Sequence, residues 1–261
     1  MTFMKLSNIA KFKIMHIFTH SLTIFGIGWS IWYNEYVWLA LSFLVFLYAG
    51  IIGVNVALHR YYSHRSFKTG PVRDWILLIS SFLPLLGSPA AWGSVHVYHH
   101  ITSDTTKDPH CPKNSNWFDV WFTRWPKIKI PLGVFKRFVR DPKMNFIHRH
   151  YFTLVVIYAL VLLLIDWKLL VFVMAIPATG CFHGASAIAV IPHLNTWGSY
   201  RNHNSNDSSR NSFIAWVLSL GEGWHNNHHQ NPRNYRSGEK WWELDHSAFI
   251  IKHFLMIPDK K

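Results

Sequence analysis

The feature that most constrains this chain is a pair of long stretches without a charged residue near the N-terminus. No charge occurs in Ile14–Trp32 or in Val37–Leu58, and only Glu35 interrupts the interval between Lys13 and Arg60. A helix needs about 20 predominantly apolar residues to cross the hydrocarbon core of a bilayer. We therefore expect two transmembrane helices that are joined by a short turn at residues 33–36.

A second apolar pair occurs in the C-terminal half of the chain. It runs over residues 151–165, turns at residues 166–168, and continues over residues 169–192. The first of these runs is short for a span, so the third helix is expected to begin within residues 146–150. Pro177 should kink the fourth helix, because proline lacks a backbone N–H and its ring clashes with the preceding turn.

The composition fits a membrane protein. Charged residues make up 15% of the chain and hydrophobic residues 50%, whereas a soluble domain has about 25% charged residues. A chain this apolar is not a disordered tail. Its two cysteines, Cys111 and Cys181, lie far apart without a CxxC motif, which excludes a disulfide scaffold and a cysteine-ligated metal site.

Between the two helix pairs, two segments are expected to lie in or on the membrane without crossing it. Residues 72–91 are apolar but contain Pro84, Gly87 and Pro89, so we expect a helix that enters the bilayer and returns, or one that lies beneath the protein. Residues 117–140 mix aromatic with basic residues, as an interfacial amphipathic segment does.

The distribution of basic residues predicts the orientation. If both turns face outward, Lys168 is the only one of 26 basic residues on that side, and the positive-inside rule places both termini in the cytoplasm. The fold class that we predict is all-α, with four transmembrane helices in two hairpins, a re-entrant or interfacial helix and a cytoplasmic histidine-rich cap. Residues 1–261 are expected to form a single membrane-embedded domain.

Histidines gather at the expected cytoplasmic ends of the spans. In a helix, positions i, i+3 and i+4 lie within an arc of roughly 100°, so the three histidines of a HxxHH motif can point together. Residues five apart lie about 140° apart and share a site only if the helix unwinds or if they serve different ions. The histidines in question are His59, His64, His96, His99, His100, His193, His225, His228 and His229.

The number of imidazoles indicates two metal ions. One catalytic zinc takes three protein ligands, whereas eight or nine nitrogens fit two ions with four or five ligands each. Imidazole suits iron, zinc, copper and nickel alike, so ligand type alone does not select the metal. The alternative, in which these are interfacial histidines that bind carbonyls and headgroups, fits one histidine better than three repeated clusters.

The three motifs His59-x4-His64, His96-x2-His99-His100 and His225-x2-His228-His229 resemble the histidine boxes of membrane fatty acid desaturases. The flanking sequences HRYYSHRSF (59–67), DPH (108–110) and GEGWHNNHH (221–229) resemble the stearoyl or acyl-lipid Δ9 class. The resemblance covers about residues 36 to 245.

The resemblance implies oxygen-dependent desaturation of a saturated fatty acyl chain at a non-haem centre of two iron ions. Its ligands would be the eight box histidines and His193. The spans would enclose an apolar tunnel for the acyl chain, and dioxygen would be the co-substrate. Removing hydrogen from an unactivated methylene needs an oxidant that no side chain supplies. Electrons would come from a separate ferredoxin or cytochrome b type donor with its reductase.

Three positions depart from the family pattern. Val97 replaces an arginine of the second box, and Ser94-Val95 replace an Arg-Asp pair that acyl-CoA members often carry near the polar head of the carrier. This favours a lipid-linked or protein-linked acyl chain over a coenzyme A thioester. Ala189 stands where many relatives have an asparagine that holds a metal-bound water, so either Asn195 or a water would complete the second iron.

Other side chains are expected to support the site. Asp108 and Glu222 each lie in a motif beside a histidine cluster and should orient imidazoles, and His110 is a weaker candidate for an outer ligand. Phe43, Phe46 and His183 are candidates for lining the substrate tunnel, although core packing also explains the two aromatic residues. The basic excess of +13 fits membrane lipids or an acidic donor, and no nucleic-acid module is recognisable.

Two other functions compete with desaturation. A membrane hydroxylase would use the same two-iron site and give an oxygenated product. A metal-transporting or metal-sensing membrane protein would bind exchangeable metal and consume no oxygen, but histidine clusters on one face only provide no path across the membrane.

Overall fold

The structure is a computed structural model, and it describes residues 7–123 and 129–257. Four of its helices are long and apolar enough to cross a membrane, and the described residues form no β-sheet. The prediction of an all-helical fold with four candidate spans is confirmed. The four are Asn8–Tyr33, Tyr36–Ser63, Pro142–Ile165 and Trp167–His193.

The first hairpin consists of α1 (Asn8–Tyr33) and α2 (Tyr36–Tyr48). The backbone N–H of Ala10 bonds to the Ser7 hydroxyl, which caps the start of α1. At its other end Asn34 adopts a left-handed conformation with φ 58° and ends the helix. The turn therefore consists of Asn34 and Glu35, so the turn predicted at residues 33–36 was in the right place but too long.

The helix that begins with α2 continues without interruption as a π-helical segment, Ala49–Ser63. In a π-helix the backbone hydrogen bonds join residues i and i+5, one residue more than in an α-helix. The last of them runs from the His64 N–H to the His59 carbonyl at 3.2 Å. Residues five apart therefore lie above one another on this segment.

The second hairpin corrects two expectations. Helix α7 is Pro142–Ile165, so the predicted start within residues 146–150 was wrong. The Asp141 carboxylate accepts the Lys143 N–H at 2.8 Å, and this cap begins the helix earlier. The predicted turn over residues 166–168 was also too long. Only Asp166 leaves the helix, because its carboxylate accepts the Lys168 N–H and caps a new helix at once.

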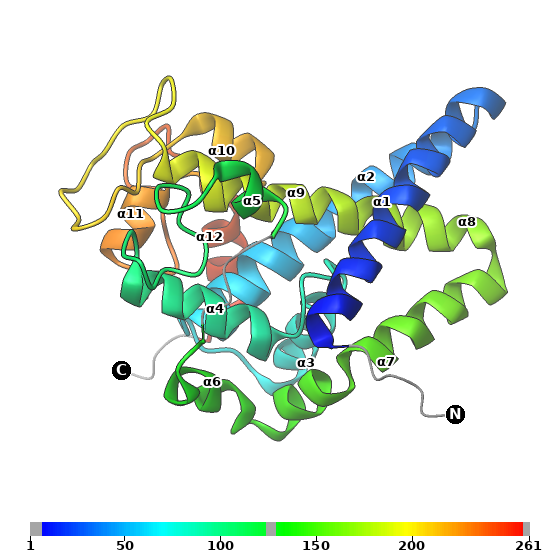
Figure 1. The fold of residues 1–261 in the computed structure, drawn as a ribbon, viewed down its shortest axis with the longest axis horizontal. Helices are drawn as coiled ribbons and strands as arrows, with labels where there is room; N and C mark the ends of the chain where they lie inside the picture. Colours follow the sequence, from blue (N-terminus) through cyan, green and yellow to red (C-terminus); the bar gives the residue numbers. More distant parts are fainter. Residues whose placement is uncertain (1–6, 124–128, 258–261) are drawn as a thin grey trace.

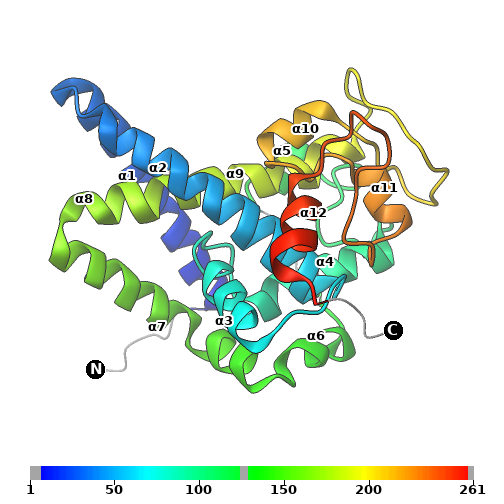
Figure 2. The ribbon, with the colours of Figure 1, turned by 180° about the vertical axis from the view of Figure 1, so that it is seen from behind.

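The fourth span changes helix type along its length and is the inner helix of the molecule. About 67% of its most apolar window is buried, against 11–28% in the other three spans. Figures 1 and 2 show it running as α8 and α9 past the first hairpin towards the cap. Its segments are α8 (Trp167–Leu169), a π-helical turn (Leu170–Ala175), α9 (Ile176–Val190) and a 3₁₀ turn (Ile191–His193).

Shorter helices build the rest of the molecule. Helix α3 (Pro71–Ser80) is separated from α4 (Pro89–Thr102) by a break in which Leu85 and Gly87 have positive φ angles. The prolines and glycine thus interrupt this segment as expected, while its depth in the membrane stays a prediction. Residues 124–128 of the predicted interfacial segment lie outside the described residues. The remaining helices are α5 (Trp117–Trp121), α6 (Leu132–Val139), α10 (Phe213–Leu218), α11 (His225–Gln230) and α12 (His246–Ile250), which ends in a π-helical turn (Ile251–Leu255).

The turns of both hairpins lie at one end of the molecule, and the cap lies at the other (Figures 1 and 2). In Figure 1 the turns between α1 and α2 and between α7 and α8 lie towards the right, and the short helices of the cap lie towards the left. A buried apolar cluster joins the cap to the second span. It includes residues of the π-helical segment and of α3, α4, α6, α7 and the C-terminal turn, among them Val56, Leu77, Val97, Phe138, Met144 and Ile251.

Candidate metal centre

Five imidazoles from three parts of the chain meet at one point, and their Nε2 atoms face one another. The contacts between these nitrogens measure 2.9 Å from His59 to His228, 2.7 Å from His64 to His96, 3.2 Å from His96 to His100 and 3.1 Å from His100 to His228. We call this set the five-histidine group: His59, His64, His96, His100 and His228.

A four-histidine group lies beside it. One nitrogen from each ring lies within 4.8 Å of the others, and the Nε2 atoms of His193 and His225 are 3.1 Å apart. The Nε2 atoms of His99 and His229 are buried and have no hydrogen-bond partner. The four members are His99, His193, His225 and His229.

Both groups fit metal ions. Two nitrogens that each lie about 2.1 Å from one ion at a right angle are separated by about 3.0 Å, close to the separations seen here. Without an ion, each Nε2 atom either donates its one proton or offers its one lone pair, so the four close contacts cannot all be hydrogen bonds. The buried partnerless nitrogens of His99 and His229 would also cost free energy if nothing bound them.

Burial keeps several of these rings in the form that binds metal. Removal from water, together with the neighbouring imidazoles, holds the pKa of His96, His100, His225 and His228 well below the ordinary value of 6.5. A neutral imidazole has a free lone pair, whereas the imidazolium has none. These four side chains therefore present unprotonated nitrogens at neutral pH.

The three histidines of a HxxHH motif were expected to point together, but the structure divides them between the two groups. On α4, His96 and His100 enter the five-histidine group, while His99 enters the other. On α11, His225 and His229 enter the four-histidine group, while His228 enters the first. Positions i and i+4 stack along one helix face and position i+3 lies to the other side, so one helix can supply ligands to both groups.

The two histidines of the first box reach the same group because they lie at the end of the π-helical segment. His59 and His64 are five residues apart and both belong to the five-histidine group, with ring centroids 4.9 Å apart. In a regular helix they would diverge by about 140°. The i to i+5 hydrogen bonding brings residues at this spacing to the same side. The wider turn thus replaces the unwinding that the sequence suggested.

Two carboxylates that the sequence singled out contact the outer nitrogens of these rings. Asp108 Oδ1 lies 2.9 Å from His99 Nδ1, and Glu222 Oε2 lies 3.0 Å from His59 Nδ1. An ionised carboxylate only accepts hydrogen bonds, so each ring carries its proton on Nδ1. The lone pair is then on Nε2, which faces the group.

Two further aspartates act near the site and were missed from the sequence. Asp207 Oδ2 lies 2.5 Å from His229 Nδ1, and Asp104 Oδ1 lies 3.8 Å from His193 Nδ1. Both come from loops without a recognisable motif. Only the position of Asp104 shortly after the second box gave a signal that could have identified it.

Ionisation of these acids is favoured despite their burial. For Asp108, burial opposes the charged form, but the hydrogen bond from His99 outweighs it and lowers the pKa below its ordinary value. The same balance, with His229 as the donor, lowers the pKa of Asp207. These carboxylates therefore stay charged at neutral pH and hold their imidazoles in place.

Arg60 links the first box to the third. This fully buried guanidinium lies 2.9 Å from Glu222 Oε1 and 2.8 Å from Asp245 Oδ1. Burial alone would raise the pKa of Glu222, but Arg60 and His59 outweigh it and lower that pKa to about 2. The arginine thereby fixes the carboxylate that orients His59.

Three other candidates are placed differently. The His110 ring stacks on His99 with centroids 4.2 Å apart, and it forms a third potential ligand cluster with His99 and Asp108. Asn195 is exposed and does not belong to either histidine group. Ala189 lines a cavity that also reaches His99 and His225.

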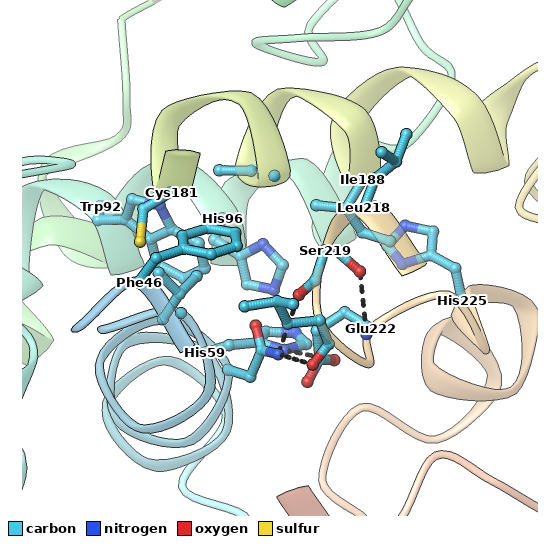
Figure 3. A pocket seen from close by; sticks show the side chains of 16 residues that line it. Phe46, His59, Trp92, His96, Cys181, Ile188, Leu218, Ser219, Glu222 and His225 are labelled. Carbon is cyan, nitrogen blue, oxygen red and sulfur yellow. Dashed lines mark hydrogen bonds and ion pairs between the residues drawn. The ribbon is translucent and has the colours of Figure 1, made fainter. Parts of the chain in front are cut away.

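Two cavities border the histidine groups and share part of their lining. The wider one has a volume of about 740 Å³ and lies between α1, α4, α7 and α9. The narrower one, about 50 Å³, has an almost entirely apolar lining that includes Phe46, Cys181 and Leu218 (Figure 3). Residues that line both are Trp92, His96, Ala185, Ile188 and His225.

Only one of the three tunnel candidates lines either of these two cavities. Phe46 contributes to the narrow one, whereas Phe43 is 57% exposed on the outside of α2. His183 instead accepts a hydrogen bond from the Trp121 indole N–H at 3.0 Å, and its other nitrogen lies 3.3 Å from His20 Nε2. It therefore joins α9 to α5 and α1 within the helix bundle.

Comparison with known proteins gives one family. The sequence model described as "Fatty acid desaturase" matches residues 36–255. The chain is 31% identical to Delta-9 acyl-lipid desaturase 2 of Arabidopsis thaliana, over 91% of this chain and 77% of the relative. It is 30% identical to sn-1 stearoyl-lipid 9-desaturase of Synechocystis sp., over 83% of this chain and 69% of the relative.

A third relative has a different regiospecificity and carrier. The chain is 30% identical to acyl-CoA C20 Delta5-desaturase of Anemone leveillei, over 89% of this chain and 74% of that protein. The comparisons therefore agree on the reaction and differ on the position of the double bond. Together with the four candidate spans and the buried histidine clusters, they show that the chain belongs to the fatty acid desaturase family and is a membrane oxidoreductase with a histidine-cluster metal site.

Proposed function

We propose that this desaturase introduces a Δ9 double bond into a saturated acyl chain that is carried by a membrane lipid, with dioxygen as co-substrate. The observation that carries the proposal is that two cavities with shared lining residues border the two histidine groups. An acyl chain that extends through both would pass His96 and His225, one member of each group. The Δ9 position is supported by the names of the Arabidopsis and Synechocystis relatives.

The metal in this proposal is a pair of iron ions, one in each histidine group. When bound, the two ions would supply, with dioxygen, the oxidising power that removes hydrogen from an unactivated methylene. The protein contributes the ligands and their orientation. Asp108, Asp207 and Glu222 hold protons on the Nδ1 atoms of His99, His229 and His59, so that their Nε2 atoms remain free to bind.

The wide cavity supports a lipid-linked substrate. Its lining includes Lys11, Lys13 and Arg149 but no aspartate or glutamate. Because Lys13 and Arg149 are exposed, these cations lie where a negatively charged headgroup would meet the protein. The replacement of the family's Arg-Asp pair by Ser94-Val95 supports the same carrier.

The narrow cavity suits the methyl end of the chain. Its walls are apolar, and Gly50 and Gly184 allow Leu220 and the Leu218 carbonyl to approach closely. A polar carrier could not be desolvated there without loss of its hydrogen bonds. The reacting carbons would then lie beside Trp92, which lines both cavities.

Electron supply and orientation complete the proposal. The described residues contain no recognisable redox module, so we propose a separate ferredoxin or cytochrome b type donor with its reductase. The distribution of basic residues supports an active site and both termini on the cytoplasmic side, with residues 1–261 acting as one domain.

Expression in a host that cannot make unsaturated fatty acids tests this function. We expect a monounsaturated Δ9 product in the lipid fraction by gas chromatography with mass spectrometry, and about two iron ions per purified chain. His193→Ala, expressed to the same level, should lose the product. Saturated lipids in the presence of two bound irons, or an oxygenated product, would contradict desaturation.

A further inference from the structure

The two histidine groups differ in the carboxylates around them. In the four-histidine group, three of the four rings face an aspartate across their outer nitrogen, at 2.9 Å, 2.5 Å and 3.8 Å. In the five-histidine group, the ion pairs of the described residues connect one ring to a carboxylate, at 3.0 Å. The pairs are His99 with Asp108, His229 with Asp207, His193 with Asp104, and His59 with Glu222.

Among the described residues, no buried cation forms an ion pair with the carboxylates of the four-histidine group, and Arg201 donates to the backbone carbonyl of Asp207 rather than to its carboxylate. Asp207 otherwise accepts bonds from the neutral hydroxyls of Ser205 and Ser209 at 2.8 and 2.5 Å. Asp108 accepts from backbone N–H groups as well as from His99. The cation nearest to Asp104 is Lys113 at 3.7 Å, and its side chain is 49% exposed. Solvent weakens such a pair.

Cations surround the five-histidine group instead. Arg60 neutralises Glu222 from 2.9 Å and is itself buried. Arg137 donates a hydrogen bond of 2.6 Å to the carbonyl of Ser63, the residue directly before His64. One half of the centre therefore lies among negative side chains, and the other half lies beside two guanidinium groups.

We propose that this asymmetry makes the two metal positions unequal: the four-histidine group binds the first divalent ion, and it stabilises that ion in its oxidised, trivalent state. This inference rests on the proposed function for the identity of the metal. A carboxylate that accepts the Nδ1 proton raises the basicity of the imidazole, and the nearby negative charge attracts a trivalent ion more than a divalent one. Asp104, Asp108 and Asp207 act through the ligands and are positioning residues.

Iron titration of the purified full chain in detergent tests the inference without any measurement of activity. The protein is stripped with a chelator and given one equivalent of ⁵⁷Fe²⁺ without oxygen, and Mössbauer spectra report which position fills. His193→Ala and His64→Ala, each of which removes a ligand from one group only, assign the signals. We expect the first equivalent of iron to give the Mössbauer signal that the spectrum of His193→Ala lacks.

The oxidation order is measured on the fully loaded protein. One equivalent of ferricyanide takes one electron from one Fe²⁺, giving Fe³⁺ and ferrocyanide. The Fe³⁺ signal should arise in the position that the first equivalent of iron filled. Fe³⁺ in the five-histidine position, or an equal division between the two, would overturn the redox half of the inference.

Asp207→Asn and Asp108→Asn remove the charge and keep the size of the side chain. Each should weaken the four-histidine position by about 10–100-fold and shift the first equivalent towards the other group. Glu239→Gln is the matched control, because this exposed acid binds His203, outside both groups. If circular dichroism shows that Asp207→Asn is unfolded, the iron affinity of Asp108→Asn decides the test.

Three results would overturn the inference. They are equal affinity of the two positions, first filling of the five-histidine group, and wild-type affinity in a folded Asp108→Asn protein. A chain that binds no iron at all would overturn the proposed function as well. A chain that binds two equivalent irons and still makes the double bond would overturn only this inference.

Discussion

Arg60 is the single residue on which most of the polar architecture behind the first box depends. Its guanidinium contacts Glu222, Asp245 and the carbonyl of Tyr235. Removing one partner of a buried ion pair leaves the other charge without compensation. The stability of the cap is therefore tied to a side chain that does not itself face the metal positions.

Arg60→Met tests this dependence. The variant keeps an apolar stem and leaves Glu222 and Asp245 unpaired, so we expect a loss of about 3–5 kcal/mol in the free energy of unfolding. Thermal unfolding in detergent measures it. Arg233→Met removes an exposed arginine of the same region and should change stability by no more than about 0.5 kcal/mol. Equal unfolding midpoints in the two variants would contradict the assignment.

At the scale of single residues, the sequence predicted the histidines better than their partners. The boxes are recognisable because their spacing is fixed along one helix, as in α4 and α11. Asp207 lies in a loop, and its distance to His229 depends on how that loop folds back over α11. His96 and His100 belong to one group and His99 to the other. This assignment requires two groups that lie side by side, and the spacing within the motif does not specify that arrangement.

Among the elements, the second span is a candidate membrane helix that ends directly at the first histidine box. Its course from Tyr36 to Ser63 was predictable because a run without charge is visible in the sequence. Its π-helical hydrogen bonding was not, because hydropathy is the same for both helix types. The five-residue spacing of His59 and His64 was the only indication. The early start of α7 and the single-residue break at Asp166 depend on caps that hydropathy also ignores.

Gly53 tests how tightly this span packs. A Cβ atom there would lie 2.5 Å from the Ser80 carbonyl oxygen and 2.9 Å from Pro84 Cγ. Gly53→Ala should therefore force the segment after α3 away and cost about 1–3 kcal/mol, measured as a lower thermal midpoint in detergent.

Gly28→Ala is the matched control for that substitution. It places the same methyl group on α1, where nothing lies within 4 Å of the new atom. Alanine favours a helix over glycine by about 0.5–1 kcal/mol, so this variant should be as stable as the wild type or more so. If Gly53→Ala and Gly28→Ala unfolded at the same temperature, the Ser80–Pro84 segment would move away from the new methyl group without loss of stability.

On the scale of the whole molecule, the helices α4 and α11, which carry six of the nine histidines, lie towards the end opposite to the turns of the two hairpins (Figures 1 and 2). The sequence indicated this, because the boxes follow apolar spans and the turns contain few charges. It did not show that the nine histidines from four segments divide into a group of five and a group of four. That division follows from the packing of α4 and α11 against the ends of the spans.

The orientation of the whole molecule gives a prediction for intact cells. The native cysteines Cys111 and Cys181 are buried, so a single introduced cysteine can be labelled selectively. With a membrane-impermeant maleimide, Asn34→Cys should react from outside, and Arg233→Cys should react only after permeabilisation. The reverse pattern would place the histidine groups outside the cell.

The π-helical segment also limits how the chain can change in length. Deleting one residue between His59 and His64 would leave a spacing of four, which keeps both rings on one face if the segment returns to α-helical hydrogen bonding. An added residue would leave a spacing of six, which turns one ring away from the other in an α-helix and in a π-helix alike. The interval from 59 to 64 should therefore tolerate shortening by one residue, together with a change of helix type, but not lengthening among active descendants of this protein.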